Sequence, residues 1–589
     1  MALHTLALTL ASGLASGLAS GLAAGTDAGA PSSRTDGWLA AHAHPIVSID
    51  PAHDDDADLE PLRAIVGDAR IVMIGEASHQ AGTDMLARAR MIRWLRDELG
   101  FGVLRIESGR GDVKRVQDAL DAGQPIETAA PRGIISLWSE TREGLAGLRE
   151  AADGMTIMGY DAQTSGPRGS AEPWRPLLEA ALAAADELPE GERLDDARRE
   201  RLDGAIELIS DGVHAKMVTV QRVMGQSAAM PASLDGLDLA AEYGRLADDL
   251  DALTAALGAP EGDDLGLALR AAASLGSFSR NLALETQSSF WSSPEFFAES
   301  FTRRDRAGAD NVLWVARELA PDERIILWAH DAHISKAHVS AAAMIGAPPE
   351  QSAAPRPGFG VPLGRHLADA MGDAVVSIGF IGSDSDGLAR APAGAPGVQE
   401  SGAELPVEGS LEQLCSDDTD AEHLLVDLRA GDLPFSICGP IDHAPVEMDD
   451  WSRAYDALFW SRVVESSTRC GARRLDPLRC RSDVVEAGGG DRVAAAEAAE
   501  QDPRPGLEAL ILVELVEDER DRRARRVAEA LDVAGERGEP EGLTDRVRHP
   551  GVRLVQRDDV VRLQRVTALV AVRLRVPGHQ TQHVPEGGP

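Results

Sequence analysis

Short apolar runs that stop abruptly at glycine or at an ionisable residue recur along this chain, and they constrain its fold more than any other feature. Runs of about four to six apolar residues bounded in this way are typical of strands buried on both faces of a parallel sheet. Four of the runs lead into chemistry-bearing residues: Ile71–Ile74 before Gly75 and Glu76, Gly102–Ile106 before Glu107, Thr156–Tyr160 before Asp161, and Arg324–Ala329 before His330.

Segments with helical spacing separate these runs. Between residues 84 and 99 the apolar side chains recur with the period of a helix, and Gly100 stands where a helix commonly ends. Further strands are expected at Val375–Phe380 and Leu424–Leu428. Strands that alternate with helices predict an α/β domain with a largely parallel central sheet flanked by helices. We therefore expect several ionisable residues to meet at one rim, beyond the carboxyl ends of the strands.

The overall composition narrows the class of partner. With 589 residues the chain is long enough for a sizeable core and for more than one structured unit. Its 58 basic and 96 acidic residues give a formal charge of −38, which argues against a nucleic-acid partner because phosphate binding needs a basic surface. Four scattered cysteines do not make a disulfide scaffold or a zinc knuckle. No segment after the leader is long and apolar enough to cross a bilayer, so no membrane partner is expected.

Composition also divides the chain into regions. Residues 1–35 are a low-complexity leader, or a signal peptide without the usual positive start. The α/β domain is expected over residues 36–468, with a helical insertion subdomain at about 165–300, where strand signals are few. Residues 469–589 contain no aromatic residue and hold 21 Arg against 22 Asp plus Glu, so we expect a disordered tail without a catalytic role. A cytoplasmic location is expected, with export through the leader as the alternative.

Glu76 and His79 are the first candidates for chemistry. A carboxylate and an imidazole three residues apart, just after a buried strand, suit proton transfer at the ligand-binding edge of the sheet. A structural interpretation stays open beside this one. Glu76 could cap the following helix, and His79 could be an interior histidine with satisfied hydrogen bonds.

His330 and His333 form a second candidate pair, spaced three residues apart after another buried strand. Imidazole is a common zinc ligand, and carboxylates complete such sites. A proton shuttle is an equally natural role at the usual pKa of histidine. The third interpretation is that both are ordinary polar residues in a loop.

The ordered set of motifs resembles the erythromycin esterase family, and the likeness covers about residues 36 to 468. The spacing of 28 residues from His79 to Glu107 agrees with the family signature. The matching segments follow in the family's order: Gly75–His79, Arg88, Gly100–Phe101 leading to Glu107, Gly159–Asp161, Arg304–Asp305 with Asn311, Trp328–His333, Leu363–Leu367 and Tyr455–Phe459.

Members of this family hydrolyse the macrolactone ester of erythromycin-type antibiotics, so the resemblance implies a hydrolase of a small-molecule ester that needs no cofactor and no metal. It also implies an α/β core with added helices. By this likeness His79 is the general base that takes a proton from water. Glu76 and Glu107 orient the base or the water, and His330 and His333 complete the cleft.

The resemblance gives Arg88 a place among the catalytic residues and gives Arg304 and Asp161 a place in substrate binding. The two arginines are expected near the carboxylates or the developing oxyanion, and surface ion pairing stays open for Arg304. The chain departs from the family at Asp331, where Asn is common. An additional negative charge there would raise the pKa of a neighbouring histidine and favour a bound cation.

Three functions remain open from the sequence. The first is an esterase that opens a macrolactone or related ester with water activated by a histidine. No Gly-x-Ser-x-Gly elbow is present, which disfavours an acyl-enzyme. The second uses a divalent metal held by His79, His330, His333 and a carboxylate. The third is a non-catalytic accessory protein of polysaccharide biosynthesis that retains the fold.

Overall fold

The computed structural model describes residues 37–470, apart from 166–168, 224–226, 259–262, 338–359, 387–405, 407, 442–443 and 449. The expected leader lies outside the described residues, and so does the expected tail apart from its first two residues. Those two residues continue a segment that pairs with the core: Ser467 N donates to Gln80 O at 2.7 Å, and Cys470 N donates to Glu140 O at 2.9 Å. No helix among the described residues is long and apolar enough to span a membrane.

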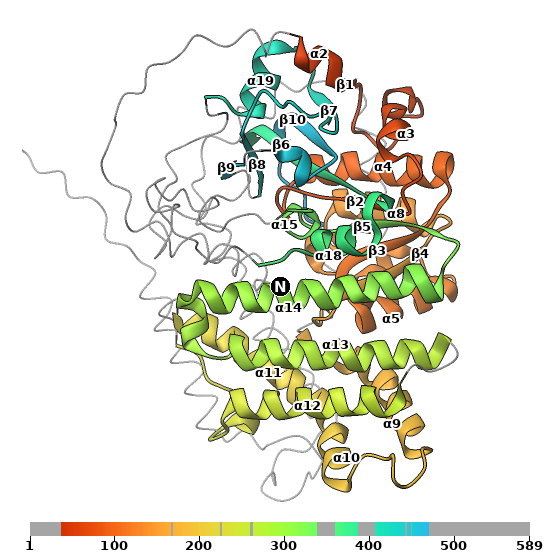
Figure 1. Cartoon of the computed structure of the whole chain (residues 1–589), viewed down its shortest axis with the longest axis vertical. Helices are drawn as coiled ribbons and strands as arrows, with labels where there is room; N and C mark the ends of the chain where they lie inside the picture. The colour runs from red at the N-terminus through yellow and green to blue at the C-terminus, as the bar shows by residue number, and fades with distance from the viewer. Residues whose placement is uncertain are drawn as a thin grey trace, which may run out of the picture. The chain divides into compact units, whose positions relative to one another are not determined.

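An eight-stranded sheet forms the centre of the fold (Figure 1). In sheet order the strands are β1 (Ala43–Ile46), β7 (His423–Asp427), β10 (Ala457–Glu465), β6 (Val375–Asp386), β2 (Ile71–Ile74), β5 (Arg324–Trp328), β3 (Phe101–Gly109) and β4 (Thr156–Asp161). The six strands from β10 to β4 are parallel, and only β7 runs against its neighbours. The predicted largely parallel α/β sheet is confirmed. A separate hairpin pairs β8 (Ile437–Ile441) with β9 (Ala444–Glu447).

Helices cover both faces of the sheet. One face packs against helices that precede β4, and its buried residues include Val72, Leu104 and Trp328. The other face, with Ile71, Val103 and Leu327, packs against helices from the second half of the fold. The helices before β4 are α2 (Trp38–His42), α3 (Pro61–Val66), α4 (Gly82–Leu99), α5 (Arg110–Asp121), α6 (Ile126–Ala129), α7 (Ser136–Ser139) and α8 (Arg142–Ala152). Those after β5 are α15 (Asp331–Ile334), α18 (Leu363–Met371) and α19 (Leu411–Asp418).

The expected helical insertion lies between β4 and β5, and its described residues contain no strand. Its own core includes Trp174, Tyr243 and Phe278. Figure 1 shows α14 running along the sheet, with α13 and α12 stacked beyond it. The helices are α9 (Arg175–Asp186), α10 (Asp196–Asp203), α11 (Ala205–Val223), α12 (Leu239–Leu257), α13 (Asp263–Glu285) and α14 (Pro294–Trp314).

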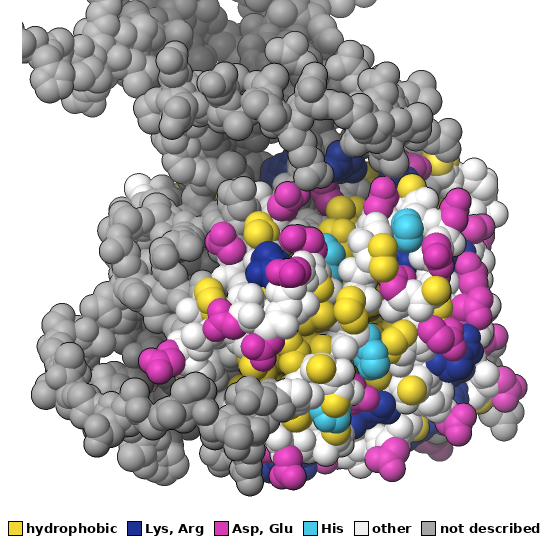
Figure 2. All heavy atoms as spheres, turned by 90° about the horizontal axis from the view of Figure 1, so that it is seen from above, with side chains coloured by type: hydrophobic (Ala, Val, Ile, Leu, Met, Phe, Trp, Pro, Cys, Tyr) yellow, Lys and Arg dark blue, Asp and Glu magenta, His cyan; other side chains and the backbone are white. Residues whose placement is uncertain are grey.

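Acidic side chains are spread over the described surface. On the face in Figure 2, Asp and Glu are more widespread than Lys and Arg, and hydrophobic side chains gather near its middle. This distribution agrees with the net charge of −38 and leaves that face without the basic footprint that nucleic-acid binding requires.

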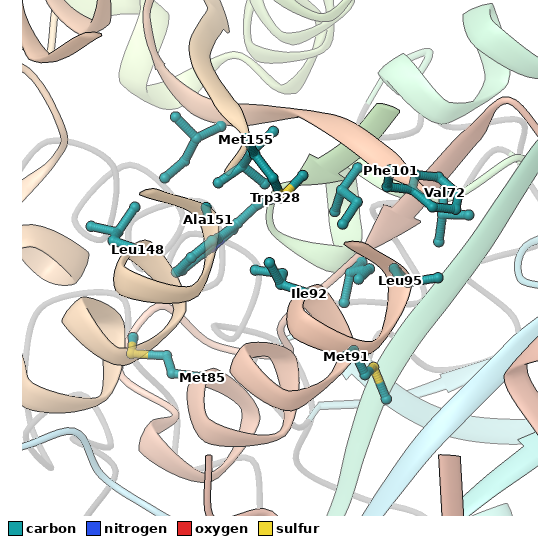
Figure 3. Packing of buried hydrophobic residues seen from close by; sticks show 14 of the residues in the cluster. Val72, Met85, Met91, Ile92, Leu95, Phe101, Leu148, Ala151, Met155 and Trp328 are labelled. Atoms are coloured by element: carbon teal, nitrogen blue, oxygen red, sulfur yellow. The ribbon is translucent and has the colours of Figure 1, made fainter. Parts of the chain in front are cut away.

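Helix α4 connects β2 to β3 and packs against one face of the sheet. Met85, Ile92 and Leu95 lie on its buried face, in one hydrophobic cluster with Leu148 of α8 (Figure 3). Gly100 ends the helix in the left-handed conformation, with φ of 69°, as the sequence predicts. The N-cap of α4 is Ala81 and not Glu76, so the interpretation of Glu76 as a helix cap is wrong.

Gly75 gives space to the side chain of Asp331 at the end of β2. A Cβ atom at Gly75 would lie 1.6 Å from Asp331 Oδ1. Asp331 is fully buried, and its Oδ2 accepts a hydrogen bond from Phe380 N at 2.8 Å. The Asp331 carboxyl group is therefore held in the space that a Cβ atom at Gly75 would need.

We expect Gly75→Ala to lower the free energy of unfolding by about 1–3 kcal/mol, the usual cost of overpacking a core. Gly102→Ala is the matched control, because a Cβ there also meets a carboxylate oxygen, Glu323 Oε2 at 2.2 Å, but on an exposed side chain that can turn away. Urea denaturation of both variants measures the difference. Equal losses in the two variants would contradict the tight packing at Gly75.

Candidate active site

The carboxyl ends of four adjacent parallel strands bring together the residues that the sequence singled out. Glu76 and His79 follow β2, and His330 and His333 follow β5, the neighbouring strand. The other predicted site residues lie near them: Glu107 close to the carboxyl end of β3, Asp161 at the end of β4, Arg88 on α4 and Arg304 on α14. Each of these eight residues is 9% exposed or less, so they form one largely buried polar cluster between the sheet and the helices.

A Glu76–His79 pair forms the first half of the site. His79 Nδ1 lies 2.6 Å from Glu76 Oε1, at 4% and 0% side-chain exposure. Arg88 Nη2 donates to Glu76 Oε2 at 2.8 Å, and the indole Nε1 of Trp138 is 3.2 Å from both carboxylate oxygens. Burial alone would raise the pKa of Glu76, but the charge of Arg88 and the hydrogen bond with His79 lower it. Glu76 is therefore an ionised carboxylate with every oxygen in use.

Arg88 acts as the counter-ion of Glu76. It is fully buried, and its guanidinium lies over the ring of Trp328, 4.3 Å from the centroid, and near Phe380 at 5.9 Å. These contacts fix the guanidinium behind the carboxylate. Arg88 is thus positioned to hold Glu76, one of the two roles that the sequence left open.

Arg304 joins the carboxylates of the second half of the site. Its Nη2 lies 2.7 Å from Asp161 Oδ2 and 2.8 Å from Glu107 Oε1, and its Nε contacts both oxygens of Asp161 at 3.1 Å. Arg304 is 9% exposed and makes no surface ion pair, so the surface interpretation is wrong. Burial alone would raise the pKa of Glu107, but the charges of His333 and Arg304 hold it well below its usual value.

His333 is a buried cation in this half. Its Nδ1 lies 2.8 Å from Asp305 Oδ1 and its Nε2 lies 3.3 Å from Glu107 Oε1. Burial would lower the pKa of His333, but the charges of Asp305 and Glu107 raise it to about 10. Arg304 Nη1 approaches His333 Nε2 to 3.2 Å, and Glu107 Oε1 lies close to both cations. Phe301 stacks on the imidazole with ring centroids 5.0 Å apart.

His330 connects the two halves, and its Nδ1 accepts a hydrogen bond. The backbone N–H of Ala332 donates to His330 Nδ1 at 3.1 Å, which leaves the ring proton on Nε2. The backbone N–H of His330 donates to Glu107 Oε2 at 3.0 Å. The imidazole of His330 faces that of His79 edge to face, with centroids 5.0 Å apart. The site thus pairs one histidine held by a carboxylate with another that presents an N–H.

Asp331 differs from the sequence expectation. Its carboxyl group points away from the histidines, towards Phe380 N and Gly75. Burial raises its pKa well above the usual value, and the charges of Asp84 and Glu76 add to the effect. Burial therefore favours the neutral form of Asp331, and its carboxyl group is held beside Phe380 N and Gly75, where the sequence had predicted a negative charge next to a histidine.

Three residues of this site were given no role by sequence reasoning, although Asp305 stood in one of the matching segments. Trp138 lies in α7, a helix of four residues, and nothing in its neighbourhood marks it as a partner of Glu76. Asp305 follows Arg304 directly, and that pairing of charges inside a helical segment was the available signal. Asp84 accepts from Ala77 N at 3.1 Å, and burial raises its pKa to about 7.

Among the described residues, no group of three or more His, Cys, Asp or Glu side chains is arranged to hold a metal ion. Both nitrogens of His333 already contact carboxylates, and His79 Nδ1 contacts Glu76.

The chain is similar to a known protein family and to two curated proteins. The family model for erythromycin esterase matches residues 97–464. Erythromycin esterase type II of Escherichia coli is 24% identical over 339 residues, which cover 56% of this chain and 73% of that protein. YbfO of Bacillus subtilis strain 168, which carries a hydrolase name, is 31% identical over 134 residues, 22% of this chain and only 29% of that protein.

Solved structures show the same fold. A protein from Bacillus cereus aligns with a TM-score of 0.53 and 18% identity, over 74% of this chain and 99% of its own. A histidine-to-asparagine variant of the erythromycin esterase EreC, in its open conformation, aligns with a TM-score of 0.50 and 21% identity, over 72% and 97% of the two chains.

The elevated pKa of His333 gives a pH prediction. Because the folded value of about 10 lies above the ordinary 6.5, protonated His333 stabilises the fold fully below pH 6.5, and this contribution is lost as the pH rises towards 10. NMR titration of the ring nitrogens should show His333 still charged at pH 8, and Asp305→Asn should lower its pKa. His366, whose pKa burial lowers, is the internal control. A His333 signal that titrates below pH 7 would contradict the assignment.

Proposed function

The chain belongs to the erythromycin esterase family, and from that premise we propose that it hydrolyses a carboxylic ester with a water molecule activated by His79. The family supports a hydrolase role. The observation that carries the proposal is the contact of 2.6 Å between His79 Nδ1 and the buried carboxylate of Glu76. A carboxylate in this position fixes the ring proton on Nδ1 and leaves Nε2 to accept a proton.

The reaction begins when His79 Nε2 takes a proton from water while the water oxygen attacks the ester carbonyl carbon. Glu76 stabilises the imidazolium that forms, and Arg88 and Trp138 keep Glu76 ionised and in place. The tetrahedral intermediate collapses by breaking the bond to the alcohol oxygen, which takes the proton back from His79. The products are an acid and an alcohol, and they are two groups of one molecule when the substrate is a lactone.

The oxyanion needs a donor on the other side of the carbonyl group. His330 Nε2–H is the donor that we propose, because Nδ1 of that ring accepts from Ala332 N and its imidazole faces His79. Glu107 acts as a positioning residue, since it binds the backbone of His330 and is itself held by Arg304 and His333. Asp161 contributes by fixing Arg304.

A macrolactone is the substrate that we propose for this site. The proposal rests on the family and on the relative named erythromycin esterase type II, which is 24% identical. The order of the site residues along the chain, which is the basis of the family resemblance, supports the same proposal. Incubation of the full chain with erythromycin, followed by mass spectrometry, should reveal a product heavier by one water molecule.

We expect His79→Ala to lower kcat/KM for the opened ester by about 10²–10⁴-fold, the usual contribution of a positioned base. Glu76→Gln should lower kcat with little change in KM, because Glu76 acts through His79 and does not touch the substrate. His44→Ala, on the edge strand β1, is the matched control and should retain full activity. Steady-state kinetics of the three variants tests this. An unchanged rate in His79→Ala would contradict the role of His79 as the base. If the wild type opens neither macrolides nor simple lactones, an accessory protein without turnover is favoured.

Removal of divalent metal should leave hydrolysis unchanged, because the proposed mechanism draws its base, its donor and its counter-ions from side chains. The measurement compares the rate before and after exhaustive chelation and dialysis, with added Zn²⁺ or Mg²⁺ as the return condition. Loss of activity on chelation and its recovery with one metal would contradict the mechanism and favour the metal-dependent alternative.

A further inference from the structure

Three arginines belong to elements that meet where β3 and β4 face the helical insertion. Asn311 of α14 joins two of these elements, since it contacts Arg110 and, on α13, Ser274. Arg105 is in the middle of β3, Arg110 begins α5 and Arg270 lies on α13. Their charges act on one another: burial lowers the pKa of Arg110 well below its usual value, and Arg105 and Arg270 lower it further. Burial also lowers the pKa of Arg105 to about 9. All three nevertheless carry a proton at neutral pH, since a guanidinium is not deprotonated in proteins.

Most side-chain nitrogens of Arg105 and Arg110 have no hydrogen-bond acceptor among the described residues. Arg105 is fully buried, and none of its three side-chain nitrogens has a hydrogen-bond partner among the described residues. Arg110 is 4% exposed, and its Nε and Nη2 are likewise without a partner there. Its Nη1 reaches only Asn311 Oδ1 at 3.4 Å, and its plane lies over Trp314, 4.6 Å from the ring centroid.

No carboxylate in the described part of the chain forms an ion pair with any of the three arginines. The other buried arginines differ in this respect: Arg88 is bound to Glu76, Arg304 to Glu107 and Asp161, and Arg90 to Asp56 and Asp58. Carboxylates are abundant in a chain of net charge −38, so their absence from this cluster sets it apart. A buried charge without a counter-ion is strongly destabilising.

We propose that Arg105, Arg110 and Arg270 bind a small inorganic oxyanion of the phosphate or sulfate type, which supplies the missing counter-charge. Planar guanidinium groups present their N–H donors in forks that match the oxygens of such an anion. The hydroxyl of Tyr160, buried on β4 and also without a partner among the described residues, is a further donor at this place. Arg270 is only half-buried, so this side of the cluster is the one nearest to solvent.

The anion site adjoins the ester cleft without sharing its residues. Arg105 and Glu107 lie two positions apart on the same face of β3, roughly 7 Å along the strand. Tyr160 lies on the neighbouring strand β4: burial raises its pKa well above the usual value, and the charge of Glu107 raises it further. Because the two sites share no residues, binding of the anion can be measured independently of ester hydrolysis.

The test is the thermal unfolding of the full chain in phosphate and in chloride at equal ionic strength. Phosphate should raise the unfolding midpoint of the wild type in a saturable way, as a ligand that binds only the folded state does. Arg105→Met should remove the saturable increase and unfold no earlier than the wild type in chloride, since it replaces an uncompensated charge by an apolar side chain. Arg63→Met, exposed and paired with Glu60 and Glu98, is the matched control and should respond as the wild type does.

Equilibrium dialysis with radiolabelled phosphate gives a second measurement, with one phosphate per chain expected and binding weakened on the order of 30-fold or more in Arg105→Met. Arg270→Met, at a half-buried position, takes its place if Arg105→Met does not fold. An equal response in Arg105→Met and Arg63→Met would show only the general stabilising effect of phosphate salts and would overturn the proposal. A response of equal size in chloride would overturn the assignment to an oxyanion.

Discussion

The carboxylate of Glu76 is the group on which the rest of the site depends. It is fully buried, and it survives there as an anion because Arg88, Trp138 and His79 surround its two oxygens. Removing any one of these partners would leave a charge or a donor uncompensated in the protein interior. The fold supplies each partner from a different element, α4, α7 and the turn after β2, so the geometry of His79 depends on the packing of one face of the sheet.

The second half of the site follows the same principle with more charges. Two cations, Arg304 and His333, meet three carboxylates, Glu107, Asp161 and Asp305, within a space that water hardly enters. The contact between His330 N and Glu107 Oε2 connects this cluster to the His330 imidazole. A rigid cluster of charged groups of this kind suits a reaction whose transition state places negative charge on one oxygen, because the surrounding dipoles need not reorganise.

Sequence reasoning recovered the parts of the fold that depend on local patterns. The bounds of β2 and β4 and the end of α4 at Gly100 follow directly from apolar runs and a glycine stop. The order of the strands did not follow, because β5 inserts between β2 and β3 through pairing across more than two hundred residues. Strand β10, which was not predicted, sits inside the sheet beside β6. Most candidate residues were found because they lie at or just after the end of a strand, and Arg88 and Arg304, which lie on helices, came from the family resemblance. Trp138 had neither marker.

The central claim is that Glu76 holds the ring proton of His79 on Nδ1 and leaves Nε2 to accept a proton from water. The most direct measurement is a ¹H–¹⁵N spectrum of the imidazole nitrogens at neutral pH, with His79→Ala to assign the signal and Glu76→Gln as the comparison. We expect a protonated Nδ1 in a strong hydrogen bond and an unprotonated Nε2. Both features should be lost in Glu76→Gln. A proton on Nε2 in the wild type, with Nδ1 bare, would contradict the account, because no base would then face the substrate.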